Sequence, residues 1–330
     1  MAVNISGLKP IKGRIKVTNR KDVNASNSGI KIYTSSRDGI VKKINSNGYE
    51  LWTFDHGDTT LSVAFDSLGN VYSGSGGLND QSIKKLDKDG NLIWTYSNPT
   101  VGVNGLIVDD SDNVYAALGD EKVQKLDPSG NVQWTFTGHQ FDSDSLSQVD
   151  SLAIDSSNNI ISRSFVTVKK LTTSGNEAWS VEIVSDNEVF GDNPPTISPT
   201  DVAVDSLDNV YATYKEGGGF RKFNSSNGNE LWMFDYFGEW FHSVAIDDSD
   251  NIYIGDGNGT IRQISTGGTV NWQKTIHGDR IEAIDVDKDG NIYTASRDNT
   301  AKRLDPNGNV LWTFSGHAQT VNSIAVDSNS

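Results

Sequence analysis

Cysteine is absent from this 330-residue sequence, which excludes disulfide bonds, thiolate metal sites and cysteine nucleophiles. Long apolar runs are absent as well, and no stretch of about eighteen apolar residues predicts a membrane span. Residues 1–19 carry lysine and arginine where a secretory signal peptide has its apolar centre, so no signal peptide is expected. These absences rule out cysteine-dependent catalysis and leave the redox compartment of the chain open.

Basic residues are scarce outside the first part of the chain. The whole sequence has 28 Lys and Arg against 43 Asp and Glu, for a formal net charge of -15. Residues 1–28 alone carry +5, so the remainder carries -20. Such a body repels a polyanion, and nucleic acid is therefore not expected as a partner. Many of the aspartates fall in recurring turn sequences, so turn chemistry explains much of the acidity.

A repeat of about 40 residues dominates the rest of the sequence. Tryptophan marks it seven times, and each of these tryptophans follows a glycine by four residues. The seven are Trp52, Trp94, Trp134, Trp179, Trp232, Trp272 and Trp312. Every unit also has an aspartate, usually followed four residues later by asparagine, and then most often Val-Tyr or Ile-Tyr. A fixed period of this length predicts an array of supersecondary units that bury their faces against one another.

The most regular unit, residues 281–317, shows what each repeat contains. Four short runs of β-forming residues are separated by breaks, two of which are Asp287–Asn291 and Asp305–Asn309. Both of these breaks place glycine where a tight hairpin needs a positive φ. Each unit is therefore predicted to be a four-stranded antiparallel meander.

The repeat starts and stops inside one unit, which predicts a closed ring. At Gly29 the sequence enters a unit at its second strand, and the missing first strand appears at 321–327. Pairing the two ends removes the open edges of a linear array. We therefore predict an all-β fold, a seven-bladed β-propeller over residues 29–330, closed by the C-terminal inner strand pairing with the N-terminal blade. Residues 1–28 are predicted to form a separate basic arm.

Two groups of motifs resemble known propeller families. The segments Leu-Asp-x-x-Gly-Asn-x-x-Trp at 126–134 and 304–312 resemble the tryptophan-docking repeat of the PQQ-like, quinoprotein-type β-propellers. The Gly-His pairs at 138–139 and 316–317, with Ser-Arg-Asp at 296–298, are similar to WD40 repeats. The resemblance covers residues 29–330. It implies that the strand ending in aspartate is innermost and the tryptophan strand outermost.

The same resemblance raises the possibility of a PQQ-dependent dehydrogenase. Catalytic members of that family are eight-bladed, usually exported, and often carry a vicinal cysteine pair over the cofactor. This chain has seven units, no visible export signal and no cysteine. The enzyme interpretation is therefore disfavoured, and no cofactor is expected.

One inner strand carries an unexpected carboxylate. Asp285 stands where five other units have alanine, and Ile107 is the other exception. We expect Asp285 to be a buried partner of a neighbouring arginine, such as Arg280 or Arg297, rather than a catalytic group. The segment from Asp285 also begins like a calcium loop, but Ser296 stands where a bidentate glutamate is required. No metal site is predicted.

All five histidines are expected in the connections from an outer strand to the next inner strand. They are His56, His139, His242, His277 and His317. Separated histidines of this kind more often stabilise turns through hydrogen bonds than bind a metal.

The same connections carry two insertions, 138–148 and 184–199, and an aromatic segment at 236–241. Long loops beside exposed aromatic residues are where a rigid scaffold usually binds its ligand. A glycan or a protein loop would suit the aromatic and amide-rich composition. Phe241 is expected in the core, and core packing is the alternative for the other aromatic residues of this segment. The candidate binding residues are Tyr236, Phe237, Trp240, His139, Phe190 and Asp192.

The arm alternates apolar and basic residues over 11–17, which is typical of an edge strand with one face exposed to solvent. It either lies against the acidic body or anchors the protein to a partner. The candidate anchor residues are Lys9, Lys12, Arg14, Lys16, Arg20 and Lys21.

Together these features predict a non-enzymatic propeller that works by binding. The first specific hypothesis is a virion-surface decoration, spike or adhesion subunit, held by its arm and located on a virion or extracellular surface. The alternative is a cytoplasmic, WD40-like protein-interaction scaffold.

Overall fold

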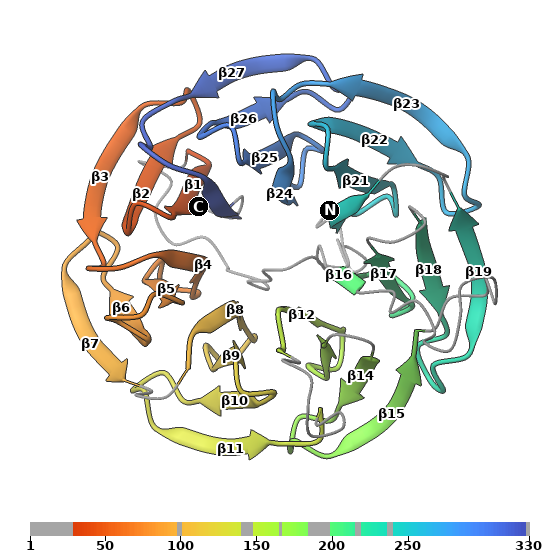
Figure 1. Ribbon diagram of the computed structural model, residues 1–330, viewed down its shortest axis with the longest axis horizontal. Helices are drawn as coiled ribbons and strands as arrows, with labels where there is room; N and C mark the ends of the chain where they lie inside the picture. The colour runs from red at the N-terminus through yellow and green to blue at the C-terminus, as the bar shows by residue number, and fades with distance from the viewer. Residues whose placement is uncertain are drawn as a thin grey trace, which may run out of the picture.

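The computed structural model describes residues 29–97, 101–139, 148–164, 167–183, 199–214, 219–235 and 240–327. In these residues 28 strands form seven four-stranded sheets, which stand as blades around a central axis (Figure 1). The prediction of a seven-bladed β-propeller is confirmed. The described part of the chain has no helix that could cross a membrane. The predicted arm lies outside the described residues.

The first three blades, numbered in chain order, each run from an inner strand at the axis to an outer strand at the rim. Blade 1 consists of β28 (Val321–Asp327), β1 (Lys31–Ser36), β2 (Ile40–Asn45) and β3 (Glu50–Asp55). Blade 2 consists of β4 (Thr60–Phe65), β5 (Val71–Ser75), β6 (Ser82–Leu86) and β7 (Leu92–Ser97). Blade 3 consists of β8 (Val103–Val108), β9 (Val114–Leu118), β10 (Val123–Leu126) and β11 (Val132–Phe136).

The remaining four blades have the same order of strands from the axis outwards. Blade 4 consists of β12 (Ser151–Ile154), β13 (Ile160–Arg163), β14 (Thr167–Leu171) and β15 (Glu177–Glu182). Blade 5 consists of β16 (Pro199–Val204), β17 (Val210–Tyr214), β18 (Gly219–Phe223) and β19 (Glu230–Asp235). Blade 6 consists of β20 (Phe241–Ile246), β21 (Ile252–Asp256), β22 (Thr260–Ile264) and β23 (Val270–Thr275). Blade 7 consists of β24 (Ile281–Val286), β25 (Ile292–Ser296), β26 (Ala301–Leu304) and β27 (Val310–Phe314).

Blade 1 joins the two ends of the chain. Strand β28 pairs antiparallel with β1, and the register places Lys31 opposite Asp327 and Ile32 opposite Val326. In Figure 1 the last strand, coloured blue, lies beside the first red strands. The predicted closure by the C-terminal inner strand is therefore observed, and it leaves no sheet edge facing a gap in the ring.

The meander gives the disc two different faces. Each inner strand runs into a turn such as 66–70 or 287–291, and this end of the blade also carries the turn between the third and outer strands. We call it the turn face. The opposite end, the connection face, carries the connections from one outer strand to the next inner strand.

The core lies between neighbouring blades and closes on the axis. Tyrosines of the second strand are buried in six blades, at most 1% exposed: Tyr33, Tyr72, Tyr115, Tyr211, Tyr253 and Tyr293. The inner-strand alanines are buried as well, at most 2% exposed. Small residues are needed there because the inner strands converge. The predicted placement of Phe241 in the core is confirmed, since its side chain is 0% exposed.

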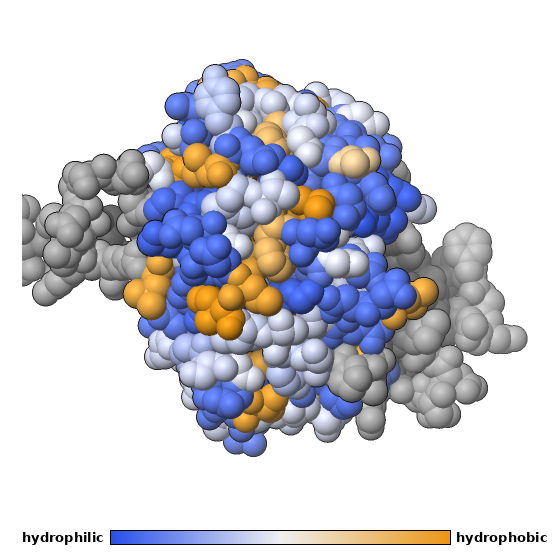
Figure 2. All heavy atoms as spheres, turned by 90° about the vertical axis from the view of Figure 1, so that its left-hand side faces the viewer, coloured by the Kyte–Doolittle hydropathy of each residue, from blue (hydrophilic) through white to orange (hydrophobic). Residues whose placement is uncertain are grey.

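The rim of the disc is formed by the outer strands. Figure 2 views the side of blades 1 and 2 and shows apolar patches separated by hydrophilic ones. Leu51, Leu92 and Ile93 are about half exposed there. Scattered apolar side chains of this kind are ordinary for a protein surface.

Candidate functional site

Each blade docks on the next through its repeat tryptophan. Trp94 Nε1 donates a hydrogen bond to the Pro128 carbonyl at 3.2 Å, and its ring covers Gly130. A Cβ on Gly130 would come within 3.3 Å of that ring, and the residue has a φ of +87°. Glycine at this position meets both requirements, a left-handed backbone and close approach of the indole. The equivalent indole bonds are made by Trp52, Trp134, Trp179 and Trp312.

A buried cation reinforces the same junction. Lys85 of β6 places Nζ 3.1 Å from Asp66 Oδ2 and also donates to the Pro128 carbonyl at 3.1 Å. The Tyr72 hydroxyl donates to Asp66 at 3.2 Å, and Lys85 Nζ lies 4.9 Å from the Tyr72 ring centroid. One ammonium group thus meets a carboxylate, a carbonyl of the next blade and an aromatic face.

This ammonium site recurs around the ring. The nitrogen-to-oxygen distances are 3.4 Å for Lys125 and Asp109, 2.8 Å for Lys170 and Asp155, and 3.0 Å for Lys222 and Asp205. In blade 7 arginine takes the place of lysine, and Arg303 donates to the Ser46 carbonyl at 2.9 Å. Lys43, Lys85, Lys170 and Arg303 bond to a carbonyl of the next blade and so join neighbouring blades, whereas Lys125 and Lys222 bind the aspartate of their own blade.

A second seam runs along the turn face nearer the axis. Asp112 accepts hydrogen bonds from the Ser67 backbone N–H at 2.7 Å and from its hydroxyl at 2.8 Å. Asp112 stands at the fourth position of its turn, where φ is +63°. The same bidentate contact joins Ser156 to Asp208 and Ser206 to Asp250 in the following blades.

The junction between blades 6 and 7 lacks both the buried cation and the serine–aspartate seam. Gln263 occupies the lysine position, between Tyr253 and Trp272 in the sheet register, and donates to the Tyr253 hydroxyl at 3.0 Å. In the seam, Asp248 stands where blades 2, 4 and 5 have serine, and Gly290 stands where blades 3, 5 and 6 have aspartate. The blades consequently part at this point of the turn face.

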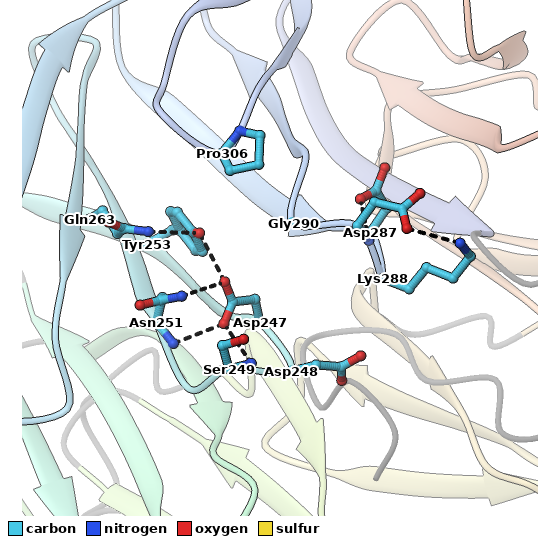
Figure 3. A pocket seen from close by; sticks show the side chains of 11 residues that line it. Asp247, Asp248, Ser249, Asn251, Tyr253, Gln263, Asp287, Lys288, Gly290 and Pro306 are labelled. Carbon is cyan, nitrogen blue, oxygen red and sulfur yellow. Dashed lines mark hydrogen bonds and ion pairs between the residues drawn. The ribbon is translucent and has the colours of Figure 1, made fainter. Parts of the chain in front are cut away.

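The gap is a pocket of about 240 Å³ (Figure 3). Blade 6 lines it with Asp247, Asp248, Ser249, Asn251, Tyr253 and Gln263, and blade 7 lines it with Asp287, Lys288, Asp289, Gly290 and Pro306. Figure 3 shows the hydrogen-bonded group around Asp247 on one side and Gly290 with Asp287 on the other. We take this pocket as one candidate functional site, beside the predicted binding face on the opposite side of the disc.

Negative charge dominates the pocket. Asp247 is buried and accepts hydrogen bonds from the Asn251 backbone and side-chain nitrogens and from the Tyr253 hydroxyl, each at 2.9 Å. Burial, together with the charges of Asp247 and Asp250, raises the pKa of Asp248 to about 6. Lys288 is the one lysine lining the pocket, and its ammonium group is bound to Asp289 at 3.0 Å. The lining of the pocket is thus acidic, and its one lysine is paired with a carboxylate of the pocket.

Sequence reasoning did not single out this pocket. Its signal was present in the repeat, because Gln263 interrupts a lysine or arginine that every other unit has at that position. Among the described residues, no group of three or more histidine, aspartate or glutamate side chains is arranged to hold a metal ion.

The predicted binding face is described only in part. Trp240 precedes β20 on the connection face and is 54% exposed, with its carbonyl held by the Gly257 N–H at 2.9 Å. Tyr236, Phe237, Phe190 and Asp192 lie outside the described residues, as do all the anchor residues of the arm.

His139 is buried rather than displayed on that face. It is 2% exposed, and its ring nitrogens make hydrogen bonds with Ser162 Oγ at 2.8 Å and Ser164 Oγ at 3.1 Å. Burial lowers the pKa of His139 to about 3. The ring therefore ties a connection to the strands below it and offers no surface to a ligand.

Three other histidines take the same structural role. His56, His277 and His317 make hydrogen bonds with the hydroxyls of Ser73, Thr294 and Thr34, respectively. The expectation that they stabilise turns fits these contacts. His242 differs from the prediction, because it lies inside β20 rather than in a connection.

Asp285 does not pair with an arginine as expected. Its carboxylate accepts the backbone N–H groups of Val286 and Val326, both at 2.8 Å, and Val326 belongs to the inner strand of the next blade. Arg280 binds Glu282 instead, at 2.6 Å. The prediction failed because the inner strand of the adjacent blade presents the N–H group of Val326 to the Asp285 carboxylate.

Comparisons with known proteins agree with this architecture. A PQQ-like family model, described as outer membrane protein assembly factor BamB, matches residues 37–218 and 215–330. Among solved structures, the WD40 β-propeller domain of Doa1 is similar with a TM-score of 0.66 and 16% identity, over 90% of this chain and 94% of that chain. At that identity the likeness shows the fold alone. No curated protein matches the sequence.

Proposed function

The chain belongs to the PQQ-like repeat family of β-propellers, and from this premise we propose that it acts by binding other molecules rather than by catalysis. The polar residues that recur in its repeat are engaged in structural contacts, as Lys85 illustrates by binding Asp66 of its own blade and the Pro128 carbonyl of the next. A ring held together in this way is a rigid frame for surface residues. On such a fold function resides in a site added to the frame, not in the frame itself.

The connection face is the surface that we assign to the main ligand. The observation that carries this assignment is Trp240, which is 54% exposed where the chain enters blade 6. The Gly257 N–H binds the Trp240 carbonyl and so fixes the backbone from which the side chain extends. An indole of this kind suits stacking on a sugar ring or burial in a protein interface. The ligand class is therefore a glycan or a protein loop.

We further propose that the protein is a subunit of a larger assembly, attached through residues 1–28. The arm carries +5 and the rest of the chain -20, so the arm suits an acidic partner or a neighbouring acidic disc. The family model that matches the chain is likewise described as an assembly factor. A virion-surface decoration, spike or adhesion subunit is the specific role we favour, at a virion or extracellular surface.

A cytoplasmic interaction scaffold is the second candidate. It is supported by the likeness to a WD40 domain and by WD40-like contacts on the connection face. There His277 contacts both Thr294, at 2.8 Å, and Asp298, at 2.9 Å. The two candidates differ in what the protein accompanies, so its neighbours in native particles or extracts distinguish them.

The test of the binding face is Trp240→Ala, measured on glycan arrays and by capture of protein partners. Loss of an anchoring indole should weaken binding about 30-fold or more, while the unfolding free energy changes by less than about 0.5 kcal/mol. Leu311→Ala, a comparably exposed residue on the rim, is the control and should bind normally. Binding that survives the loss of Trp240 contradicts the assignment.

The arm is tested by deleting residues 1–21. The truncated protein should keep the melting temperature of the propeller and fail to enter the assembly. Normal incorporation would show that the arm is not the anchor. Bound quinone, or quinone-dependent dye reduction, in the purified protein would overturn the non-catalytic assignment.

A further inference from the structure

We propose that the pocket between blades 6 and 7 binds a primary ammonium group from outside the chain, such as a lysine side chain of a partner protein. The pocket lies on the turn face, opposite the connection face that carries Trp240, and the proposal does not rest on the function assigned to that face.

The ring itself shows what this position accepts. In blades 2 to 5 the equivalent aspartate holds a lysine ammonium group at 2.8 to 3.4 Å. In blades 2 and 4 the same ammonium group also donates to a turn carbonyl of the next blade, at 3.1 and 2.8 Å. In blades 2, 3 and 5 it lies 4.9 to 5.0 Å from the centroid of a buried tyrosine. The repeat is thus a set of internal ammonium sites.

Blade 6 has the aspartate of this site and its hydrogen-bond partners, but it has no lysine at the position of the cation. Asp247 holds the same hydrogen bonds to asparagine and tyrosine as Asp66 does in blade 2. Pro306, whose place in the turn of blade 7 is that of Pro128 in blade 3, lines the pocket. Gln263 has no charge, and its amide donates to Tyr253. The carboxylate of Asp247 is therefore left without the ammonium partner of its equivalents.

The pocket has the room and the charge for that group. Its volume of about 240 Å³ far exceeds the roughly 15 Å³ that one water requires on the same measure. Asp248 and Asp289 also line the pocket, as does Asp287, whose carboxylate is bonded to Asn291 and Tyr293 of its own blade. Two cations lie near these carboxylates: Lys288 is bound to Asp289, and Arg303 lies 4.0 Å from Asp287. A cation entering the pocket gains attraction from carboxylates that the protein's own cations do not fully neutralise.

An ammonium group fits better than a metal ion. The pocket carboxylates do not form a cluster suited to a metal within the described residues. Asp247 already accepts hydrogen bonds from Ser249, Asn251 and Tyr253. The directional N–H bonds and aromatic face found at the equivalent sites suit an ammonium group, whereas calcium needs six to eight oxygen ligands.

The first experiment titrates the full-length protein with Nα-acetyl-lysine N-methylamide, n-butylamine and a lysine-bearing peptide, followed by NMR. All three should shift the Tyr253 and Gly290 amides and the Trp272 indole saturably. The uncharged norleucine analogue should not. A peptide affinity at least about tenfold above that of butylamine identifies a protein lysine as the source, and equal affinities identify a small amine. Saturation by calcium without any response to the amines would overturn the proposal.

The second experiment fills the pocket with the repeat's own residue. Gln263→Lys should raise the melting temperature and weaken amine binding at least about tenfold. Gln133→Lys, on the exposed outer strand of blade 3, adds the same charge elsewhere and should leave binding unchanged. Unaltered amine binding by folded Gln263→Lys would overturn the proposal. Asp248→Asn removes one carboxylate from the pocket lining and should weaken binding without unfolding the protein.

Discussion

Single residues that break the repeat mark the places where this ring is not symmetric. Asp285 takes a slot that holds alanine in five blades, and its buried carboxylate bonds to the backbone of the neighbouring inner strand. Burial raises its pKa to about 7. The hydrogen bonds from Val286 and Val326 favour the charged form, but they do not offset the loss of water around the carboxylate.

This carboxylate should give the stability of the protein a distinct pH dependence. Because the folded-state pKa lies above the unfolded value of 3.8, the unfolded chain releases the proton first as pH rises. The stabilising contribution is therefore complete below about pH 4 and is lost between about pH 4 and 7. The slope in that window is at most about 1.4 kcal/mol per pH unit.

Asp285→Ala, which restores the residue of the other blades, should remove that slope. Chemical denaturation of both proteins at several pH values between 4 and 8 measures it. The free energy of the wild type should fall relative to the variant as pH rises through this window. Parallel curves would show that Asp285 is not protonated in the folded state near neutral pH.

At the scale of the element, the blade junction depends on the tryptophan and the glycine beneath it. A Cβ on Gly175 would lie 2.7 Å from the Trp134 ring. The equivalent Cβ on Gly268 would have its nearest contacts at 3.9 Å, on Phe234 and Trp232. Both glycines have a similar positive φ, +82° and +83°, so they differ mainly in docking distance.

This pair separates backbone strain from blade packing. Gly268→Ala should cost about 1 to 2 kcal/mol, the strain of a left-handed alanine. Gly175→Ala should cost about 1 to 3 kcal/mol more, because its methyl group overpacks the indole. Urea unfolding of the two variants measures the difference. Equal destabilisation would mean that the tryptophan docks loosely and contributes little to the junction.

At the scale of the whole molecule, closure depends on one strand from the far end of the chain. Strand β28 supplies the inner strand of blade 1 and buries Val321, Ile324 and Val326, each at most 7% exposed. Burial of three such side chains contributes roughly 5 to 9 kcal/mol, which is comparable to the net stability of a typical domain.

Deletion of residues 321–330 should therefore abolish cooperative folding. Thermal unfolding followed by near-UV circular dichroism is a suitable measurement, since the eight tryptophans report on packing. Deletion of residues 328–330 alone is the control and should preserve the transition. A cooperative transition in the longer deletion would show that six blades hold without the closing strand.

The fold was predictable because its information is local and repeated. The glycine before Trp94 and the Asp287–Asn291 turn each specify a backbone shape within a few residues, and the repeat multiplies the signal. The site was harder to predict. His139 lies in a connection as expected, but only packing shows its ring turned inward onto Ser162. The partner of Asp285 was predicted wrongly because Val326 is remote in sequence.

The sequence by itself determined the number of blades, their four-stranded meander and the closure of the ring by the last strand, because these depend on period, turn chemistry and patterning along the chain. The tertiary structure decided which polar groups meet between blades. Lys85, Asp66 and the Pro128 carbonyl come together only when two blades pack, since the site draws on residues more than 40 positions apart. For that reason the sequence shows Gln263 only as one departure from the repeat, whereas the folded ring shows that Gln263 lines an acidic pocket between two blades.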